Sequence, residues 1–187
     1  AIEDFDGQPQ TIAGLKLLAL LFPRPGELRS SEWTEFDLKK AIWTIPAAKT
    51  KMRREHRVPL PSQAIEVLED LGKITGHKPL LLPSFYGNGK PISENTLNTA
   101  LRRMGYGQDE MTSHGFRASA STLLNESGKW SADAIERQLA HVESNNVRRA
   151  YARGAHWDER VKMMTWWAGY LDRLRGSTGK QSLKIAS

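Results

Sequence analysis

Three separated segments of the chain concentrate arginine, histidine and tyrosine, side chains suited to binding or cleaving a phosphodiester. They read LFPRPGEL, SHGFRASAS and QLAHVESNNVRRAYAR. Arginine offers phosphate oxygens a planar fork that stays charged, and histidine can donate hydrogen bonds or transfer protons. A tyrosine activated by cationic neighbours can act as a nucleophile. The chemistry that these residue types would support together is phosphoryl transfer.

Each motif taken alone also has an ordinary explanation. His114 and Arg117 are three residues apart near an expected helix start, where side chains share a face and backbone N–H groups point outward. That arrangement suits a phosphate, but the same spacing occurs by chance on solvated surfaces. Tyr151, which is flanked by arginines, could equally be a half-buried residue of a basic amphipathic helix. Only the combination of segments separates these readings.

The elements that must position these motifs are mostly helices. Apolar residues at helical spacing predict a helix over residues 12–22, and the prolines that follow limit its continuation. Two further helices are expected with Ser62 and Ser93 as N-caps and with Gly72 and Gly105 at their ends. The remaining helices are expected to begin near Ser113, Ser131 and Asp158, with a short one over residues 147–151.

Residues 33–60 follow a different pattern, in which WTEFDL, AIWTIP and HRVPL collect β-forming residues between turn-like and basic stretches. This predicts a small antiparallel sheet whose second and third strands are connected by residues 47–57. Residues 76–91, rich in glycine and proline, predict a loop, and the last twelve residues predict a flexible tail. The expected fold class is therefore mainly α with one small antiparallel β-sheet, in a single domain.

The composition favours a polyanionic partner and excludes several kinds of site. Lysine and arginine total 27 against 21 acidic residues, which gives a net charge of +6. The absence of cysteine excludes a disulfide framework, a thiol nucleophile and a thiolate zinc site. No apolar run has the length needed to cross a bilayer. His56, His77 and His156 lack ligand spacing, so we predict surface residues there and no metal site.

Taken in order, the motif residues resemble the catalytic set of the tyrosine recombinases. The matching positions are Arg24, Lys51, His114, Arg117, His141 and Tyr151. The chain is also similar to the integrases of satellite phages and bacterial genomic islands around RPGEL, before VPL, through GFRA-S and in VKMMTWWAGYLD. The resemblance covers about residues 12–175. It implies the fold of DNA breaking-rejoining enzymes for residues 1–187, with core-binding and arm-binding domains preceding them in a longer protein.

The resemblance implies that the chain cuts and rejoins DNA through a 3′-phosphotyrosine link to Tyr151, without ATP, metal or another cofactor. Arg24 and Arg117 would clamp the phosphate, because a guanidinium stabilises charge on non-bridging oxygens. His141 would add a hydrogen bond. His114 would serve in part as the base that activates Tyr151.

A lysine in the basic hairpin is the expected general acid for the departing 5′ oxygen. We favour Lys51, which stands seven residues before Val58, and Lys49 is the alternative. Lys49, Arg53, Arg54 and Arg148 are the expected contacts to DNA. About half of a further set should also contact phosphates; this set is Arg102, Arg103, Arg137 and Arg149.

The resemblance implies double-stranded attachment-site DNA and other integrase protomers as partners, in a tetramer on paired sites, in the bacterial cytoplasm at the nucleoid. The apolar helix expected over residues 157–175 would contact a neighbouring protomer or, alternatively, pack within its own domain. Three other functions stay open: a type IB topoisomerase, a catalytically idle DNA-binding regulator, and a structural helical module with accidental motifs.

Overall fold

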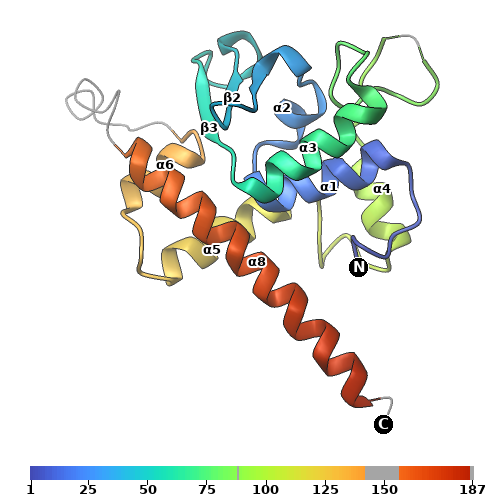
Figure 1. Ribbon diagram of the computed structural model, residues 1–187, viewed down its shortest axis with the longest axis vertical. Helices are drawn as coiled ribbons and strands as arrows, with labels where there is room; N and C mark the ends of the chain where they lie inside the picture. Colours follow the sequence, from blue (N-terminus) through green and yellow to red (C-terminus); the bar gives the residue numbers. More distant parts are fainter. Residues whose placement is uncertain (88, 142–155, 186–187) are drawn as a thin grey trace.

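The computed structural model describes residues 1–87, 89–141 and 156–185 and is mainly helical (Figure 1). Its α-helices are α1 Pro9–Leu21, α2 Pro25–Arg29, α3 Ser62–Thr75, α4 Thr96–Arg103, α5 Gly115–Glu126, α6 Ala132–Gln138 and α8 Trp157–Ile185. Its strands are β1 Phe36–Asp37, β2 Ile42–Ile45 and β3 His56–Pro59, and two short 3₁₀ helices are η1 Trp33–Glu35 and η2 Ala47–Lys49. The expected fold class is confirmed.

Helix α1 is the centre of the domain, with α3, α4, α5 and α8 packed around it (Figure 1). Leu15, Leu17 and Leu18 are completely buried although they point in different directions around the helix. A helix that is apolar on all sides must be enclosed, which explains its central place. Phe22 ends α1 in a left-handed conformation with φ of 40°, and its N–H bonds the carbonyl of Leu18. This turn directs the chain into α2.

The three strands form an antiparallel sheet in the order β1-β2-β3, so β3 lies at an edge. Trp43 on β2 is fully buried, stacks on Phe36 and donates its indole N–H to Glu35 Oε2 at 2.9 Å. The register pairs Ile45 with His56 at the end of the hairpin that joins β2 to β3. The predicted sheet and its basic connection are confirmed, except that His56 and Arg57 belong to β3 rather than to the connection.

Several predicted helix boundaries were wrong. Ser62 is the first residue of α3 and not its cap, and Ser93 lies before Asn95, the N-cap of α4. Gly72 lies inside α3, where an ideal Cβ would come within 3.6 Å of the Trp33 ring. A Cβ there would be in ordinary van der Waals contact with the ring, so Gly72 neither ends the helix nor is required by the packing of Trp33.

Helix α8 packs against α1, α6 and β3 and then projects from the body of the domain (Figure 1). Met163, Met164 and Ala168 are fully buried, and Trp167 donates its indole N–H to the carbonyl of Ala19 at 2.9 Å. The predicted flexible tail was wrong as far as Ile185, where the helix ends. Once packing anchors the first turns, each added residue gains a hydrogen bond without a new nucleation cost.

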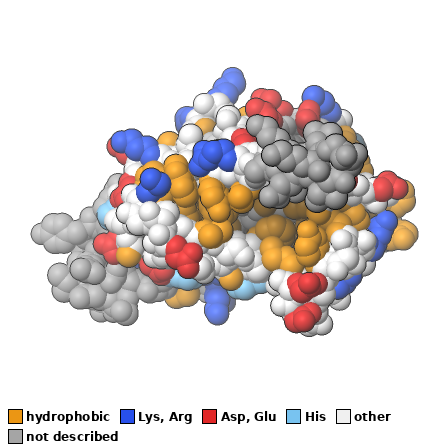
Figure 2. All heavy atoms as spheres, turned by 90° about the horizontal axis from the view of Figure 1, so that it is seen from below, with side chains coloured by type: hydrophobic (Ala, Val, Ile, Leu, Met, Phe, Trp, Pro, Cys, Tyr) orange, Lys and Arg blue, Asp and Glu red, His pale blue; other side chains and the backbone are white. Residues whose placement is uncertain are grey.

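Apolar side chains gather on the face from which α8 projects, which Figure 2 shows from below. Trp166 stacks on Tyr170 and meets Trp130 edge-on, and all three pack against the core. Much of this helix thus packs within its own domain. Val161 and Leu174 remain 39% and 46% exposed. Contact of residues 157–175 with a second protomer stays a prediction.

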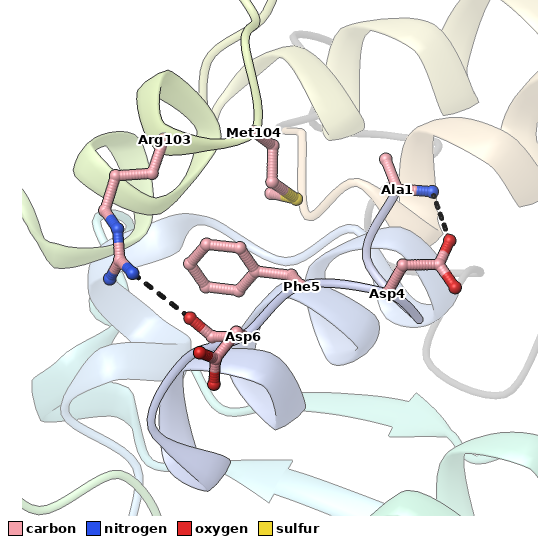
Figure 3. A pocket seen from close by; sticks show the side chains of 6 residues that line it. All are labelled: Ala1, Asp4, Phe5, Asp6, Arg103 and Met104. Carbon is pink, nitrogen blue, oxygen red and sulfur yellow. Dashed lines mark hydrogen bonds and ion pairs between the residues drawn. The ribbon is translucent and has the colours of Figure 1, made fainter.

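The N-terminal segment covers α4 (Figure 3). The guanidinium of Arg103 lies 5.1 Å from the centre of the Phe5 ring and donates to the carbonyl of Asp6 at 3.1 Å. Arg102 donates to the carbonyls of Tyr106 and Met111. Both arginines, proposed above as further phosphate contacts, therefore have partners within the domain.

None of the described helices combines the length and apolar character needed to cross a membrane.

Candidate active site

Arg24 occupies the N-cap of α2, where its backbone is extended between two prolines. Glu27, one turn later and 5% exposed, accepts from the Arg24 backbone N–H at 3.2 Å and from Nη1 at 2.9 Å. One carboxylate thus caps the helix and orients the guanidinium. Nη2 of Arg24 then donates to the carbonyl of Ala140 at 3.3 Å. We did not predict Glu27, although its position three residues after an N-cap is a capping-box signal.

Arg117 reaches the same place from the first turn of α5, and it is 6% exposed. Its guanidinium donates to the carbonyl of Phe22 at 3.2 Å and to the carbonyl of Leu139. Burial, together with the positive charge of Arg24, lowers the pKa of Arg117 to about 10. The group is still charged at neutral pH, so two guanidinium groups lie close together and the region attracts anions.

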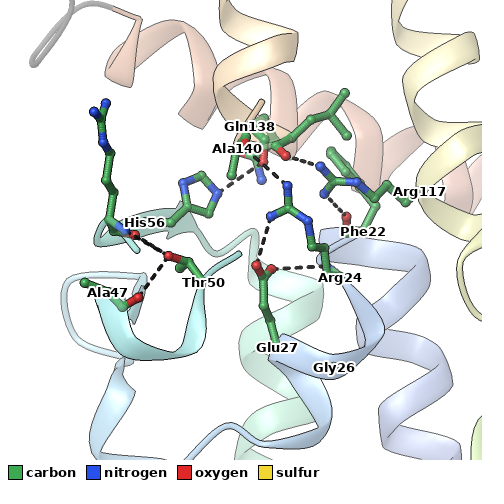
Figure 4. A network of polar contacts seen from close by, with 12 residues as sticks. Phe22, Arg24, Gly26, Glu27, Ala47, Thr50, His56, Arg117, Gln138 and Ala140 are labelled. Carbon is green, nitrogen blue, oxygen red and sulfur yellow. Dashed lines mark hydrogen bonds and ion pairs between the residues drawn. The ribbon is translucent and has the colours of Figure 1, made fainter. Parts of the chain in front are cut away.

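Three successive carbonyl oxygens at the end of α6 accept hydrogen bonds from side chains of the site (Figure 4). The carbonyl of Gln138 accepts from His56 at 3.2 Å, that of Leu139 accepts from Arg117, and that of Ala140 accepts from Arg24. The C-terminal end of a helix carries partial negative charge and stabilises cations. The two arginines therefore converge on one turn, with their donors directed at oxygen atoms as they would be at a phosphate.

The same turn positions His141. Ala140 adopts the left-handed conformation, with φ of 48°, and the N–H of His141 bonds the carbonyl of Glu136 at 3.0 Å. This is the Schellman arrangement, which usually has glycine in place of Ala140. It also brings His141 Nδ1 within 2.7 Å of Glu136 Oε2. Because a carboxylate accepts, Nδ1 carries a proton, and Nε2 can donate to a phosphate oxygen when the ring is an imidazolium.

His56 belongs to this cluster, so the prediction that it is a surface residue was wrong. Burial and the charge of Arg160 lower the pKa of His56 to about 3. The neutral ring donates Nε2–H to the carbonyl of Gln138. The strand alternation of HRVPL, which places His56 on the same face as buried Val58, could have signalled this.

The two lysines of the hairpin between β2 and β3 have different environments. Lys49 Nζ bonds Glu32 at 2.8 Å, Glu35 at 2.5 Å and the carbonyl of Ser30 at 2.9 Å. Burial opposes its charge, but the hydrogen bonds to both carboxylates outweigh burial and raise the pKa of Lys49. Lys51 is exposed and has no hydrogen bond or ion pair within the described residues.

Thr50 shapes the loop that follows Lys49. Its hydroxyl accepts from the N–H of Arg54 at 3.0 Å and lies 2.8 Å from the carbonyl of the same residue (Figure 4). Arg53 at the turn has φ of 50°, and Arg53 and Arg54 are exposed. The loop is therefore a closed turn with cationic side chains on its outside, suited to a nucleic-acid backbone.

The structure brings together Arg24, Arg117 and His141 among the predicted catalytic residues. His114 is the N-cap of α5, one turn before Arg117, and is exposed. Tyr151 and the predicted DNA contact Arg148 lie outside the described residues. Within the described ranges, no group of three or more His, Asp or Glu side chains could hold a metal ion.

Solved structures with a similar fold are tyrosine recombinases and phage integrases. The integrase of mycobacterium phage Brujita aligns with a TM-score of 0.66 and 17% identity, over 88% of this chain and 53% of that protein. XerA recombinase aligns with a TM-score of 0.60 and 18% identity, over 82% of this chain and 60% of that one. The fold is therefore that of the tyrosine recombinase catalytic domain.

The chain belongs to the phage integrase family, which it matches over residues 9–156. It is 48% identical to the integrase of Enterobacteria phage P4 over 185 residues, which cover 91% of this chain and 42% of that protein. It is 40% identical to the integrase of Shigella phage Sf6, over 92% of this chain and 44% of that protein. The chain thus spans less than half the length of these relatives, and the recognised family is confirmed.

Proposed function

We propose that this chain is the catalytic domain of a site-specific DNA recombinase that integrates and excises a mobile element through a 3′-phosphotyrosine intermediate. The observation that carries the proposal is the convergence of Arg24 and Arg117 on the turn that precedes His141, in a member of the phage integrase family. Two guanidinium groups and an imidazole around one point suit the charge of a pentavalent phosphate.

In the proposed reaction the oxygen of Tyr151 attacks the scissile phosphorus, and the bond from phosphorus to the 5′ oxygen breaks. The phenol proton passes to a base, a role assigned in part to His114, and the 5′ oxygen takes a proton from Lys51. Attack of a 5′ hydroxyl on the phosphotyrosine reverses the step. The energy of the broken bond is kept in the intermediate, so the reaction uses no ATP, metal or other cofactor.

Lys51 is the better candidate for the general acid. Lys49 is held by Glu32 and Glu35 at the base of the hairpin. If Lys49 moved to the DNA, both carboxylates would lose their cationic partner, and one of them, Glu35, is buried. The exposed ammonium of Lys51 can reach a bound DNA strand without breaking any contact in the described part of the chain. Arg53 and Arg54 on the same loop, with Arg148, are proposed contacts to the DNA backbone.

The proposed partners are double-stranded attachment-site DNA and further protomers, in a tetramer on paired sites. Lambda integrase, whose fold this chain shares with a TM-score of 0.57, was solved as a dimer bound to a core site. Core-binding and arm-binding domains are proposed to precede this domain in the whole protein. Action on DNA in the bacterial cytoplasm, at the nucleoid, follows from this function.

The test is covalent capture of DNA. The chain is incubated with nicked duplexes of randomised core sequence, and DNA that stays with the protein in denaturant is sequenced, which also identifies the site. We expect a covalent adduct with the wild type and none with Tyr151→Phe, which loses only the nucleophilic oxygen and should bind DNA normally. A persistent adduct in that variant would reject the assignment.

The same DNA separates the proposed enzyme from its alternatives. A type IB topoisomerase would relax a supercoiled plasmid without joining two sites, whereas a recombinase yields exchanged products. A DNA-binding regulator would bind and form no adduct.

A further inference from the structure

Arg160, on the first turn of α8, is a buried cation without an acidic partner among the described residues. It is 7% exposed, and all of its acceptors are neutral oxygens. Nε and Nη2 donate to Oε1 of Gln138 at 3.0 and 2.8 Å, and Nη2 also donates to the carbonyl of Arg57 at 2.6 Å. A single guanidinium therefore joins three elements: α8, α6 and β3.

The partner on β3 is available because β3 is an edge strand, whose outer carbonyls have no neighbouring strand. The partner on α6 is Gln138, which is 3% exposed and also receives the bond from His56. Two polar links between β3 and the end of α6 thus pass through Gln138. In one link, His56 donates to the backbone oxygen of Gln138. In the other, Arg160 donates both to the side-chain oxygen of Gln138 and to the carbonyl of Arg57.

An aromatic ring contacts the bridge. The ring of Trp157, one turn before Arg160, has two guanidinium groups over it, with Arg57 at 4.9 Å and Arg160 at 5.4 Å from the ring centre. Burial, followed by repulsion from Arg137 and Arg57, lowers the pKa of Arg160 to about 10, so the side chain is charged at neutral pH. Burying a charge without a counterion opposes folding, and an apolar side chain would fill the same space without that penalty.

The elements joined by Arg160 carry separate parts of the proposed active site. Strand β3 continues the hairpin that holds Lys51, and α6 ends in the carbonyls that the two site arginines contact. General acid catalysis requires the acid within hydrogen-bonding distance of the leaving oxygen, while the arginines hold the phosphorus. The distance between these parts depends on how β3 sits against α6.

We propose that Arg160 is a positioning residue for DNA cleavage: it fixes β3, and with it the hairpin of Lys51, relative to the end of α6 where the arginines converge. The inference rests on the proposed function and adds a residue that does not touch DNA. It predicts a defect in protonation of the leaving group, which a purely structural role would not single out.

The test compares two versions of the captured DNA, one with oxygen and one with sulfur at the bridging 5′ position. A sulfur leaving group needs no proton, so its cleavage does not depend on the general acid. Single-turnover adduct formation is measured for Arg160→Met, with Lys73→Met as the control, because Lys73 is an exposed cation on α3, outside the residues proposed to contact DNA or a second protomer. The ratio of oxygen to sulfur rates is independent of the folded fraction of each variant.

We expect Arg160→Met to cleave the oxygen substrate about 10- to 100-fold more slowly than the wild type and the sulfur substrate within about threefold, since small misplacements of a catalytic group have effects of this size. Arg160→Lys should give an intermediate ratio, because one ammonium cannot reproduce the fork to Gln138 and Arg57. Lys73→Met should match the wild type.

Equal losses on both substrates, or no loss, in Arg160→Met would overturn the inference. The calibrating variant is Lys51→Ala, which must be rescued by sulfur; without that rescue the assignment of the acid fails and the inference fails with it. Absence of any adduct in the wild type would instead overturn the proposed function, which distinguishes the two failures.

Discussion

His56 should make the stability of the domain fall on mild acidification. In the folded chain its pKa is about 3, against an ordinary value of 6.5 in the unfolded chain. The unfolded state therefore binds one more proton between these values, so the stabilisation is complete above pH 6.5 and is lost as the pH falls towards 3. At about 1.36 kcal/mol per pH unit, acidification from pH 7.5 to 5.0 should cost about 2 kcal/mol through this group.

The control is His56→Gln, whose amide can still donate to the carbonyl of Gln138 but does not titrate. Urea unfolding at pH 7.5 and 5.0 gives the free energy of unfolding of both proteins. The four other histidines and all carboxylates titrate in both, so the difference isolates His56. We expect the variant to lose about 2 kcal/mol less than the wild type on acidification. The same loss in both proteins would refute the assignment of a neutral imidazole in the folded chain.

Three further substitutions test the site. Ala140→Gly should raise the free energy of unfolding by about 1 kcal/mol in urea titrations, because glycine adopts a positive φ without strain; destabilisation would contradict the Schellman geometry. Glu27→Ala should lower it by about 2 kcal/mol and slow cleavage at least about tenfold, since Arg24 loses its charged partner; unchanged kinetics would exclude Glu27 from orienting Arg24. Lys51→Ala should cleave only sulfur-bridged DNA well, and the same behaviour in Lys49→Ala would move the acid by two residues.

Site residues could be predicted where the neighbouring sequence identifies them, and not where their role depends on residues far away in the chain. Arg24 and Arg117 stand in motifs whose residue types and order identify them without coordinates. Glu27 carried a local signal that we did not use. For His56 the strand alternation indicated the buried face but not the acceptor, which lies 82 residues away in the chain. Arg160 carried little local signal, because its acceptors lie 22 and 103 residues away.

The helix boundaries show the same limit. Gly72 has the residue type that often ends a helix, but α3 continues past it to Thr75, and the buried side chains of Leu71 and Thr75 hold this part of the helix against the domain. Helix α8 continues to Ile185 through residues that composition alone assigns to a tail. In α8 the turns packed against the domain supply the nucleus, and propagation of the helix beyond them outweighs an intrinsic cost of only about 1 kcal/mol per glycine.

The main-chain oxygens that hold the two site arginines have a consequence for turnover. A DNA phosphate that takes their place exchanges one set of hydrogen bonds for another, and the net gain of such an exchange is far smaller than the strength of the new bonds. We therefore expect the catalytic centre itself to hold DNA weakly, with residence time set by contacts elsewhere along the duplex. When the strands have been resealed, the guanidinium groups can return to the carbonyls of Leu139 and Ala140, and the product is free to leave.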